Sequence, residues 1–156
     1  MAERLRLVLL AALVVLASQA LVAVGPQAAS GTSIAAGSGK SIEFFARTPH
    51  GIASCAIYAG SGASTEAFCE SFRPQRESKA TVSARGKVSI CASRQTSSDR
   101  CRLGNAGEGT PTFGYGHRVT IGPFRCAVQP KGVRCVVAAS GKGFLFNPIR
   151  AVRVGP

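Results

Sequence analysis

The amino-acid sequence predicts an all-β protein: a small disulfide-stapled domain of antiparallel hairpins that follows an N-terminal signal peptide. Short apolar stretches alternate with polar residues at a period of two, as in strands with one buried face. Gly, Pro and Asn residues separate these stretches and indicate turns. Six cysteines lie behind an apolar N-terminal segment, where an even count favours three disulfides. No stretch after residue 30 has the 3.6-residue pattern of an ordinary helix.

The first 29 residues have the layout of a secretory signal peptide. A short charged stretch ends at Arg6, the apolar run at residues 7–17 follows, and small residues offer a cleavage site after Ala20 or after Ala29. The alternative is an uncleaved anchor, because the apolar run extends to Val24 and so reaches the roughly 20 residues of a spanning helix. With either reading, we expect the protein to be secreted or associated with the cell envelope.

The protein is strongly basic, with 19 Lys and Arg residues against 7 Asp and Glu residues and a net charge of +12. A chain that begins at Ser30 keeps a charge of +11, because the removed segment contains two arginines and one glutamate. Such a charge attracts polyanions at long range, and salt weakens the attraction. The alternative interpretation is that the excess of arginine only keeps an exported protein soluble.

The first part of the mature chain predicts a linker and a hairpin. Residues 30–40 are rich in Gly and Ser and have little to bury, so we expect a flexible linker before a single domain at residues 41–156. Residues 42–47 alternate and predict a strand, residues 48–51 (TPHG) predict a turn, and residues 52–58 predict the second strand.

The middle of the chain predicts loops and one further hairpin. Residues 67–69 indicate a short strand or one helical turn, and the polar residues 73–79, which include a proline, indicate a loop. Residues 81–92 predict a hairpin that turns at residues 85–87 (RGK). Residues 95–112 are poor in apolar side chains, and a loop of that length is either functional or mobile.

The last third predicts three strands in succession, at residues 118–121, 124–128 and 133–137, and one more apolar segment at residues 144–154, punctuated by Asn147 and Pro148. An internal echo supports a duplicated hairpin, since residues 52–57 (IASCAI) resemble residues 123–128 (PFRCAV) and a loop with a second cysteine follows each. Six positions are too few to establish a duplication.

The cysteines predict disulfides rather than a metal site or a free thiol. The shortest spacing, from Cys126 to Cys135, leaves eight residues between them, whereas zinc sites usually contain a close pair. Cys91 falls on the face opposite Val88 and Ile90, so it points toward the loop that carries Cys101. The expected pairing is Cys55–Cys69, Cys91–Cys101 and Cys126–Cys135.

The register of the last cysteine hairpin stays open between two alternatives. If Gln129 lies opposite Gly132, then Cys126 lies opposite Cys135 on the apolar face. A tight two-residue loop of the usual hairpin type requires a positive φ at Pro130, which proline cannot adopt. A type I turn with Gly132 in the left-handed region is easier, but it slips the register by one and needs a bulge to restore the sulfur pair.

Five short motifs carry a resemblance. They are TPHGIASC at residues 48–55, FGYG at 113–116, GPFRC at 122–126, GVRC at 132–135 and SGKGF at 140–144. With these motifs, residues 42–146 resemble a family of secreted actinobacterial Cys-rich domains of unknown function.

This resemblance implies secretion, disulfides and a small β-rich fold, and it implies no activity. Lys142 stands where the family usually has a histidine, which argues against a catalytic role for that position. Cys101 has no evident family counterpart, and a family cysteine between Cys69 and Cys91 is missing, which implies a rewired middle disulfide.

The sequence offers weak signals for catalysis. His50 and His117 are the only histidines and have no acid near them in sequence, although a hydrolase triad needs a nucleophile and an orienting acid beside the histidine. Glu66 and Glu70 could share a helix face as a glycosidase pair, but two solvated acids in a serine-rich stretch is the simpler interpretation. The Gly-rich residues 104–116 lack the strand, the Lys-Ser/Thr pair and the helix of a phosphate loop.

A basic face is the strongest functional signal. Arg118, Arg125 and Arg134 lie on three successive predicted strands, and the latter two occupy the face opposite the cysteines. Lys131 and Lys142 complete the candidate anion-binding set. No nucleic-acid motif is present, and two tyrosines supply little base stacking.

We therefore expect an exported, non-enzymatic binding module without cofactor or metal, whose partner is an anionic polymer, a membrane surface or an acidic protein. The alternatives are a structural or protein-interaction component of the cell envelope and a small secreted hydrolase or enzyme inhibitor.

Overall fold

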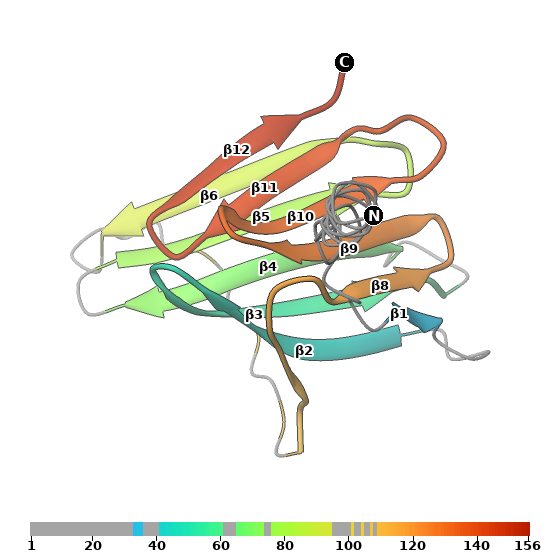
Figure 1. Cartoon of the computed structure of the whole chain (residues 1–156). Coiled ribbons are helices and arrows are strands. Elements are labelled where there is room, and N and C mark those ends of the chain that lie inside the picture. The colour runs from blue at the N-terminus through green and yellow to red at the C-terminus, as the bar shows by residue number, and fades with distance from the viewer. Residues whose placement is uncertain are drawn as a thin grey trace, which may run out of the picture. The chain divides into compact units, whose positions relative to one another are not determined.

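The protein is all-β, with two six-stranded sheets that pack face to face. The computed structural model describes residues 33–35, 41–60, 65–73, 76–94, 101, 104, 107 and 109–156. In Figure 1 the strands of one sheet run from cyan to yellow, and the orange and red strands of the other lie in front of them. The described residues form no helix, which confirms the predicted fold class. The signal peptide predicted at residues 1–29 lies outside the described residues.

The first sheet is an antiparallel meander of five long strands with one short strand added at its edge. The strand order is β6-β5-β4-β3-β2-β7, and only the β2–β7 pair is parallel. The strands are β2 (Ser41–Thr48), β3 (Gly51–Tyr58), β4 (Glu66–Arg73), β5 (Arg76–Ser83), β6 (Val88–Arg94) and β7 (Thr112–Phe113).

The second sheet has the same plan. Its order is β1-β8-β9-β10-β11-β12, with a parallel pair only between β1 and β8. The strands are β1 (Ser33–Ala35), β8 (Arg118–Ile121), β9 (Phe124–Gln129), β10 (Gly132–Val137), β11 (Gly143–Asn147) and β12 (Arg150–Val154).

The two sheets exchange their leading strands. β1 comes just before the first meander in sequence but pairs with β8 of the second sheet, and β7 comes just before the second meander but pairs with β2 of the first. In both meanders a disulfide joins the second strand to the third. The arrangement is therefore one half-domain plan used twice, as the internal sequence echo suggested.

The core lies between the sheets and consists of the inward residues of every long strand. The largest fully buried side chains are Phe44 of the first sheet and Phe124, Phe144 and Phe146 of the second. Full burial of each such side chain contributes about 1.5–3 kcal/mol. Because strand side chains alternate between faces, the same pattern that buries these rings turns the intervening residues outward.

The three disulfides join the pairs expected from the sequence: Cys55–Cys69, Cys91–Cys101 and Cys126–Cys135. The first and third connect directly opposed residues on the inner faces, where all four cysteines are at most 3% exposed. Cys91 points outward from β6, as predicted, and reaches Cys101 in the segment that follows.

The β9–β10 hairpin resolves the open question of register. Gln129 lies opposite Gly132 and Cys126 opposite Cys135, so the predicted slip and its compensating bulge do not occur. Gly132 has a φ of +136°, which gives the turn a left-handed residue without requiring one at Pro130. A side chain at Gly132 would collide with the carbonyl oxygen of Phe146, so glycine is also required for the close approach of β11.

Three sequence predictions for secondary structure were wrong or incomplete. The expected short element at 67–69 and loop at 73–79 together form the long β4–β5 hairpin, paired from Glu66 with Ser83 to Arg73 with Arg76. The apolar tail is the β11–β12 hairpin rather than one segment. Ser33–Ala35, inside the expected flexible linker, forms β1.

Candidate anion-binding face

Three arginines share the outer face of the second sheet. In one row across the strands, Arg118 of β8 lies opposite Ala127 of β9, which lies opposite Arg134 of β10. In the next row, Thr120, Arg125 and Val136 follow one another in the same way. Residues that pair across strands point to the same side of a sheet. The structure therefore brings together the three arginines that the sequence assigned to one face.

These arginines surround an open depression of about 640 Å³. Ala127 is the small outward residue between Arg118 and Arg134, so it forms the floor. Neighbouring strands are about 4.8 Å apart, which places the α-carbons of these two arginines about 10 Å from each other. Arg125 stands beside this line on the middle strand, and Gln129 and Val136 are among the other lining residues.

Within the part of the chain that the structure describes, no carboxylate neutralises these guanidinium groups. Residues 111–156 contain no Asp or Glu. Among the residues that the structure describes, the single ion pair joins Lys79 to Glu70 on the other sheet. Arg118 and Arg125 are exposed and Arg134 is half-buried. Three unpaired cations around one depression create a locally positive potential, which attracts an anion most strongly at low salt.

The other two predicted members of the set lie elsewhere. Lys131 is in the β9–β10 turn and lines a separate depression of about 420 Å³ with His50 and Arg150. Lys142 is in the β10–β11 loop, at the opposite end of β10, next to Gly86 of the first sheet. The six residues of β10 separate the two lysines by about 20 Å. The set predicted from sequence therefore divides into one three-arginine face and two outlying lysines.

The outer face of the first sheet is covered where that of the second sheet is open. The covering segment, which we call the strap, includes Cys101, Gly104 and residues 109–111. Its Cys101 is bonded to Cys91 on β6, and its Pro111 carbonyl accepts the backbone N–H of Phe45 on β2. The strap therefore crosses the sheet from one side to the other.

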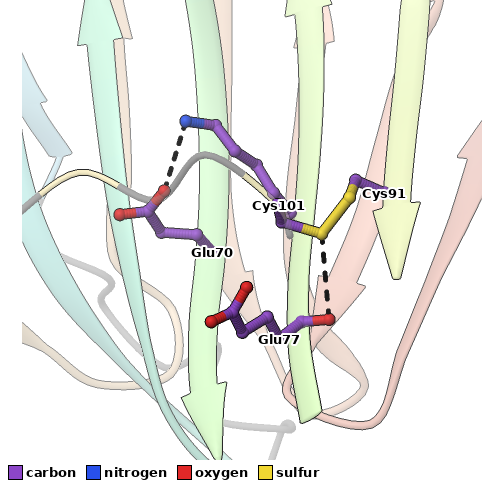
Figure 2. The surroundings of a disulfide bond; sticks show 5 residues. Glu70, Glu77, Cys91 and Cys101 are labelled. Carbon is purple, nitrogen blue, oxygen red and sulfur yellow. Dashed lines mark hydrogen bonds and ion pairs between the residues drawn. A yellow bond between two sulfur atoms is a disulfide. The ribbon is translucent and has the colours of Figure 1, made fainter. Parts of the chain in front are cut away.

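A buried glutamate holds the middle of the strap. The backbone N–H of Gly104 donates to Glu70 Oε1 at 2.8 Å, and Glu70 Oε2 lies 3.2 Å from Lys79 Nζ. Glu70 is only 3% exposed, so both contacts replace water that the carboxylate has lost. Lys79 also lies over the ring of Phe68, 4.0 Å from its centre. Figure 2 shows Glu70 and Glu77 beside the Cys91–Cys101 disulfide, whose Cys101 sulfur contacts the backbone carbonyl of Glu77.

A second carboxylate on the outer face of the first sheet, that of Glu43, raises the pKa of a tyrosine. The hydroxyl of Tyr58 donates to Glu43 Oε1 at 2.6 Å. This hydrogen bond to a carboxylate, together with partial burial and the negative charge of Glu43, raises the pKa of Tyr58 to about 12 from its ordinary 10. A small cavity of about 40 Å³ remains between these residues, Glu70 and Gly104.

Apart from the Cys91–Cys101 disulfide, the sequence did not identify the strap contacts, because they depend on which residues the sheet brings under it. Glu66 and Glu70 do not share a helix: both lie on the outer face of strand β4, about 13 Å apart along it. Glu70 is also not the solvated acid that the sequence suggested, because the strap buries it. Lys79 was assigned to a loop, and its position opposite Glu70 follows from the β4–β5 register.

The histidines lie apart from these groups. His50 is exposed in the β2–β3 turn. His117 is half-buried, with its ring stacked on Phe113 at 5.1 Å and its Nδ1 3.1 Å from the carbonyl oxygen of Gly114. The described residues contain no cluster of three His, Cys, Asp or Glu side chains that would hold a metal ion. They also contain no helix long and apolar enough to cross a membrane. Asp99 and Glu108 lie outside the described residues.

Comparisons of this chain with protein-family models, with curated proteins and with solved structures found no match. The resemblance to the secreted actinobacterial domains therefore stays a prediction. The fold and the two contrasting outer faces are the observations from which a function is argued.

Proposed function

We propose that this protein is an exported, non-enzymatic binding module that engages an anionic partner through the outer face of the second sheet. The observation that carries the proposal is the arrangement of Arg118, Arg125 and Arg134 around one open depression to which the described residues bring no neutralising carboxylate. Surface charges without a structural role contribute little to stability, so the face costs the fold little and remains available for a partner.

Export is supported by two independent features. The N-terminal segment has the layout of a signal peptide, and the three disulfides are consistent with an oxidising compartment outside the cytosol. The disulfides also restrict the unfolded chain, which helps a domain of this size to stay folded after export.

Retention on immobilised heparin and binding to anionic vesicles test the proposal. We expect retention at low salt that is lost by about 0.5 M salt, because counter-ions screen exposed charges. Replacing Arg118 and Arg125 by Gln should lower the eluting salt concentration more than the same change at Arg47 and Arg76, which are exposed on the first sheet. Equal elution of the two double variants would show that net charge, and not this face, drives retention. No retention at low salt would remove the proposal altogether.

A further inference from the structure

The outer faces of the two sheets each have a hollow, and the two hollows lie at equivalent positions in the strand plan. Cys55 and Cys126 occupy matching places in the two meanders, because each lies on the second strand and pairs with the cysteine of the third. Counting outward from this pair, Ala56 corresponds to Ala127, and Tyr58 to Gln129. The small cavity under the strap and the open depression are therefore lined by corresponding residues.

The chain itself fills this position on the first sheet. Gly104 of the strap lies over the cavity, donates to Glu70 and reduces the empty space to about 40 Å³. On the second sheet no described residue takes the place of Gly104, and about 640 Å³ stays open. A polypeptide segment that crosses the strands is thus the occupant for which this half-domain plan already provides one example.

The charges around the two positions differ. Where the first sheet has one acid, Glu43, and the uncharged Ser54 and Phe68, the second has Arg118, Arg125 and Arg134. The first sheet holds the strap by accepting a backbone N–H at a carboxylate. Guanidinium groups are donors only, so they would instead hold side-chain carboxylates and backbone carbonyl oxygens.

We propose that the depression over Ala127 receives an extended acidic segment of a partner protein, laid across β8, β9 and β10 as the strap lies across the first sheet. This inference rests on the proposed function and narrows its anionic partner to a polypeptide. The span of about 10 Å between Arg118 and Arg134 equals about three residues of extended chain, so acids two or three positions apart reach both arginines. The recessed floor favours a chain that enters the depression over a flat membrane surface.

Filling the floor without changing the charge separates this proposal from simple attraction. Ala127→Leu inserts a larger side chain into the depression and keeps all three arginines, and the smaller change Ala127→Val suits a strand and guards against misfolding. Arg125→Gln removes one charge from the face, and Arg47→Gln on β2 is its matched control. The probes are a short peptide of alternating glutamate and glycine, the same peptide with glutamine in place of glutamate, and phosphatidylglycerol vesicles.

We expect the acidic peptide to bind and the glutamine peptide not to bind. Ala127→Leu should weaken peptide binding at least about tenfold, with Ala127→Val intermediate, while vesicle binding changes less than about twofold. Arg125→Gln should weaken binding to both probes, and Arg47→Gln should weaken neither. Amide resonances of β8, β9 and β10 should shift on addition of the peptide.

Three results would overturn the inference. In the first result, vesicles bind in a way that depends on Arg125, but the peptide does not bind or its binding is insensitive to Ala127→Leu. This result would support the proposed function and contradict the proposal that the depression binds a peptide. Self-association that depends on Arg125, seen by sedimentation, would assign the depression to a second copy of this chain. Failure of every anionic probe would remove both proposals.

Discussion

The outer faces of the two sheets share one strand plan and differ in what covers them. On the first sheet the strap covers Glu70, whose carboxylate accepts the N–H of Gly104 and forms an ion pair with Lys79 of β5. On the second sheet the corresponding surface stays open, has no acid and presents three arginines. The covered face holds its buried Glu70 with contacts from the chain itself, whereas the open face leaves its charges for a partner. Each of the following changes tests a different part of this contrast.

Removing a disulfide should cause the largest loss of stability. The loss should be larger for a disulfide on the inner face of a sheet than for one on an outer face. Cys91–Cys101 and Cys126–Cys135 close sequence separations of 10 and 9 residues, so their effects on the entropy of the unfolded chain are nearly equal. We expect Cys126→Ala with Cys135→Ala to lower the free energy of unfolding by about 2–5 kcal/mol, and by more than Cys91→Ala with Cys101→Ala, because only the former leaves a hole in the core. Urea unfolding measures both losses.

The double variant Cys91→Ala with Cys101→Ala should also differ from the core variant in its hydrogen exchange. Hydrogen exchange at the Gly104 amide should speed up in it, since the strap loses its tether while the core keeps its packing. Equal losses of stability in the two double variants, with unchanged exchange at Gly104, would show that the strap disulfide supports the core as much as the buried one does.

Gly143→Ala should have the next largest effect, because β11 passes too close to the backbone of β10 at this position to admit a side chain. Gly143 of β11 corresponds to Lys79 of β5, but a Cβ at Gly143 would collide with the carbonyl oxygen of Cys135 and lie 2.7 Å from the α-carbon of Val136. We expect a loss of about 1–3 kcal/mol, as for other overpacked sites. Gly107→Ala on the strap meets nothing within 4 Å and serves as the control. A loss of stability no larger than that of the control would mean that β11 shifts away from β10 without a cost in free energy.

The smallest expected effect is the pH dependence that Tyr58 gives to the first sheet. Because folding raises its pKa from 10 to about 12, the stabilisation is complete below pH 10 and disappears as the pH rises toward 12. In Tyr115→Phe, which leaves Tyr58 as the remaining tyrosine, tyrosinate absorbance should titrate near pH 12. Adding Glu43→Gln should bring the midpoint back toward 10, and a midpoint already near 10 without that change would contradict the Tyr58–Glu43 hydrogen bond.

Local patterns predicted most of the strands, and contacts between distant segments explain the failures. Alternation and turn residues located β2, β3, β8, β9 and β10, because each of these strands buries apolar residues on one face. The β4–β5 hairpin has buried polar residues, including Ser71 and Ser78 on the inner face and Glu70 and Glu77 on the outer face. In sequence such residues indicate a loop. They are buried here because the second sheet covers one side and the strap lies on the other.

The prediction of the candidate site also succeeded where local patterns decide and failed where distant contacts decide. Alternation sufficed to place Arg125 and Arg134 opposite the cysteines, and the predicted hairpin added Arg118. Lys131 and Lys142 were grouped with them by proximity in sequence, although they lie in turns at opposite ends of β10. The open state of the depression could not be predicted, because among the described residues a strap covers the first sheet and none covers the second.

The exchange of β1 and β7 between the sheets sets an order of assembly. Each meander can form from neighbouring strands as the chain is made, but β1 must wait for β8, with Ser33 and Arg118 separated by 85 positions. The two short strands, β1 and β7, therefore pair last. Amides of β1 should gain protection after those of β3 in pulse-labelled refolding. Until β1 and β7 pair, β2 and β8 are bare sheet edges, so a newly made chain is most exposed to mispairing with its neighbours during that interval.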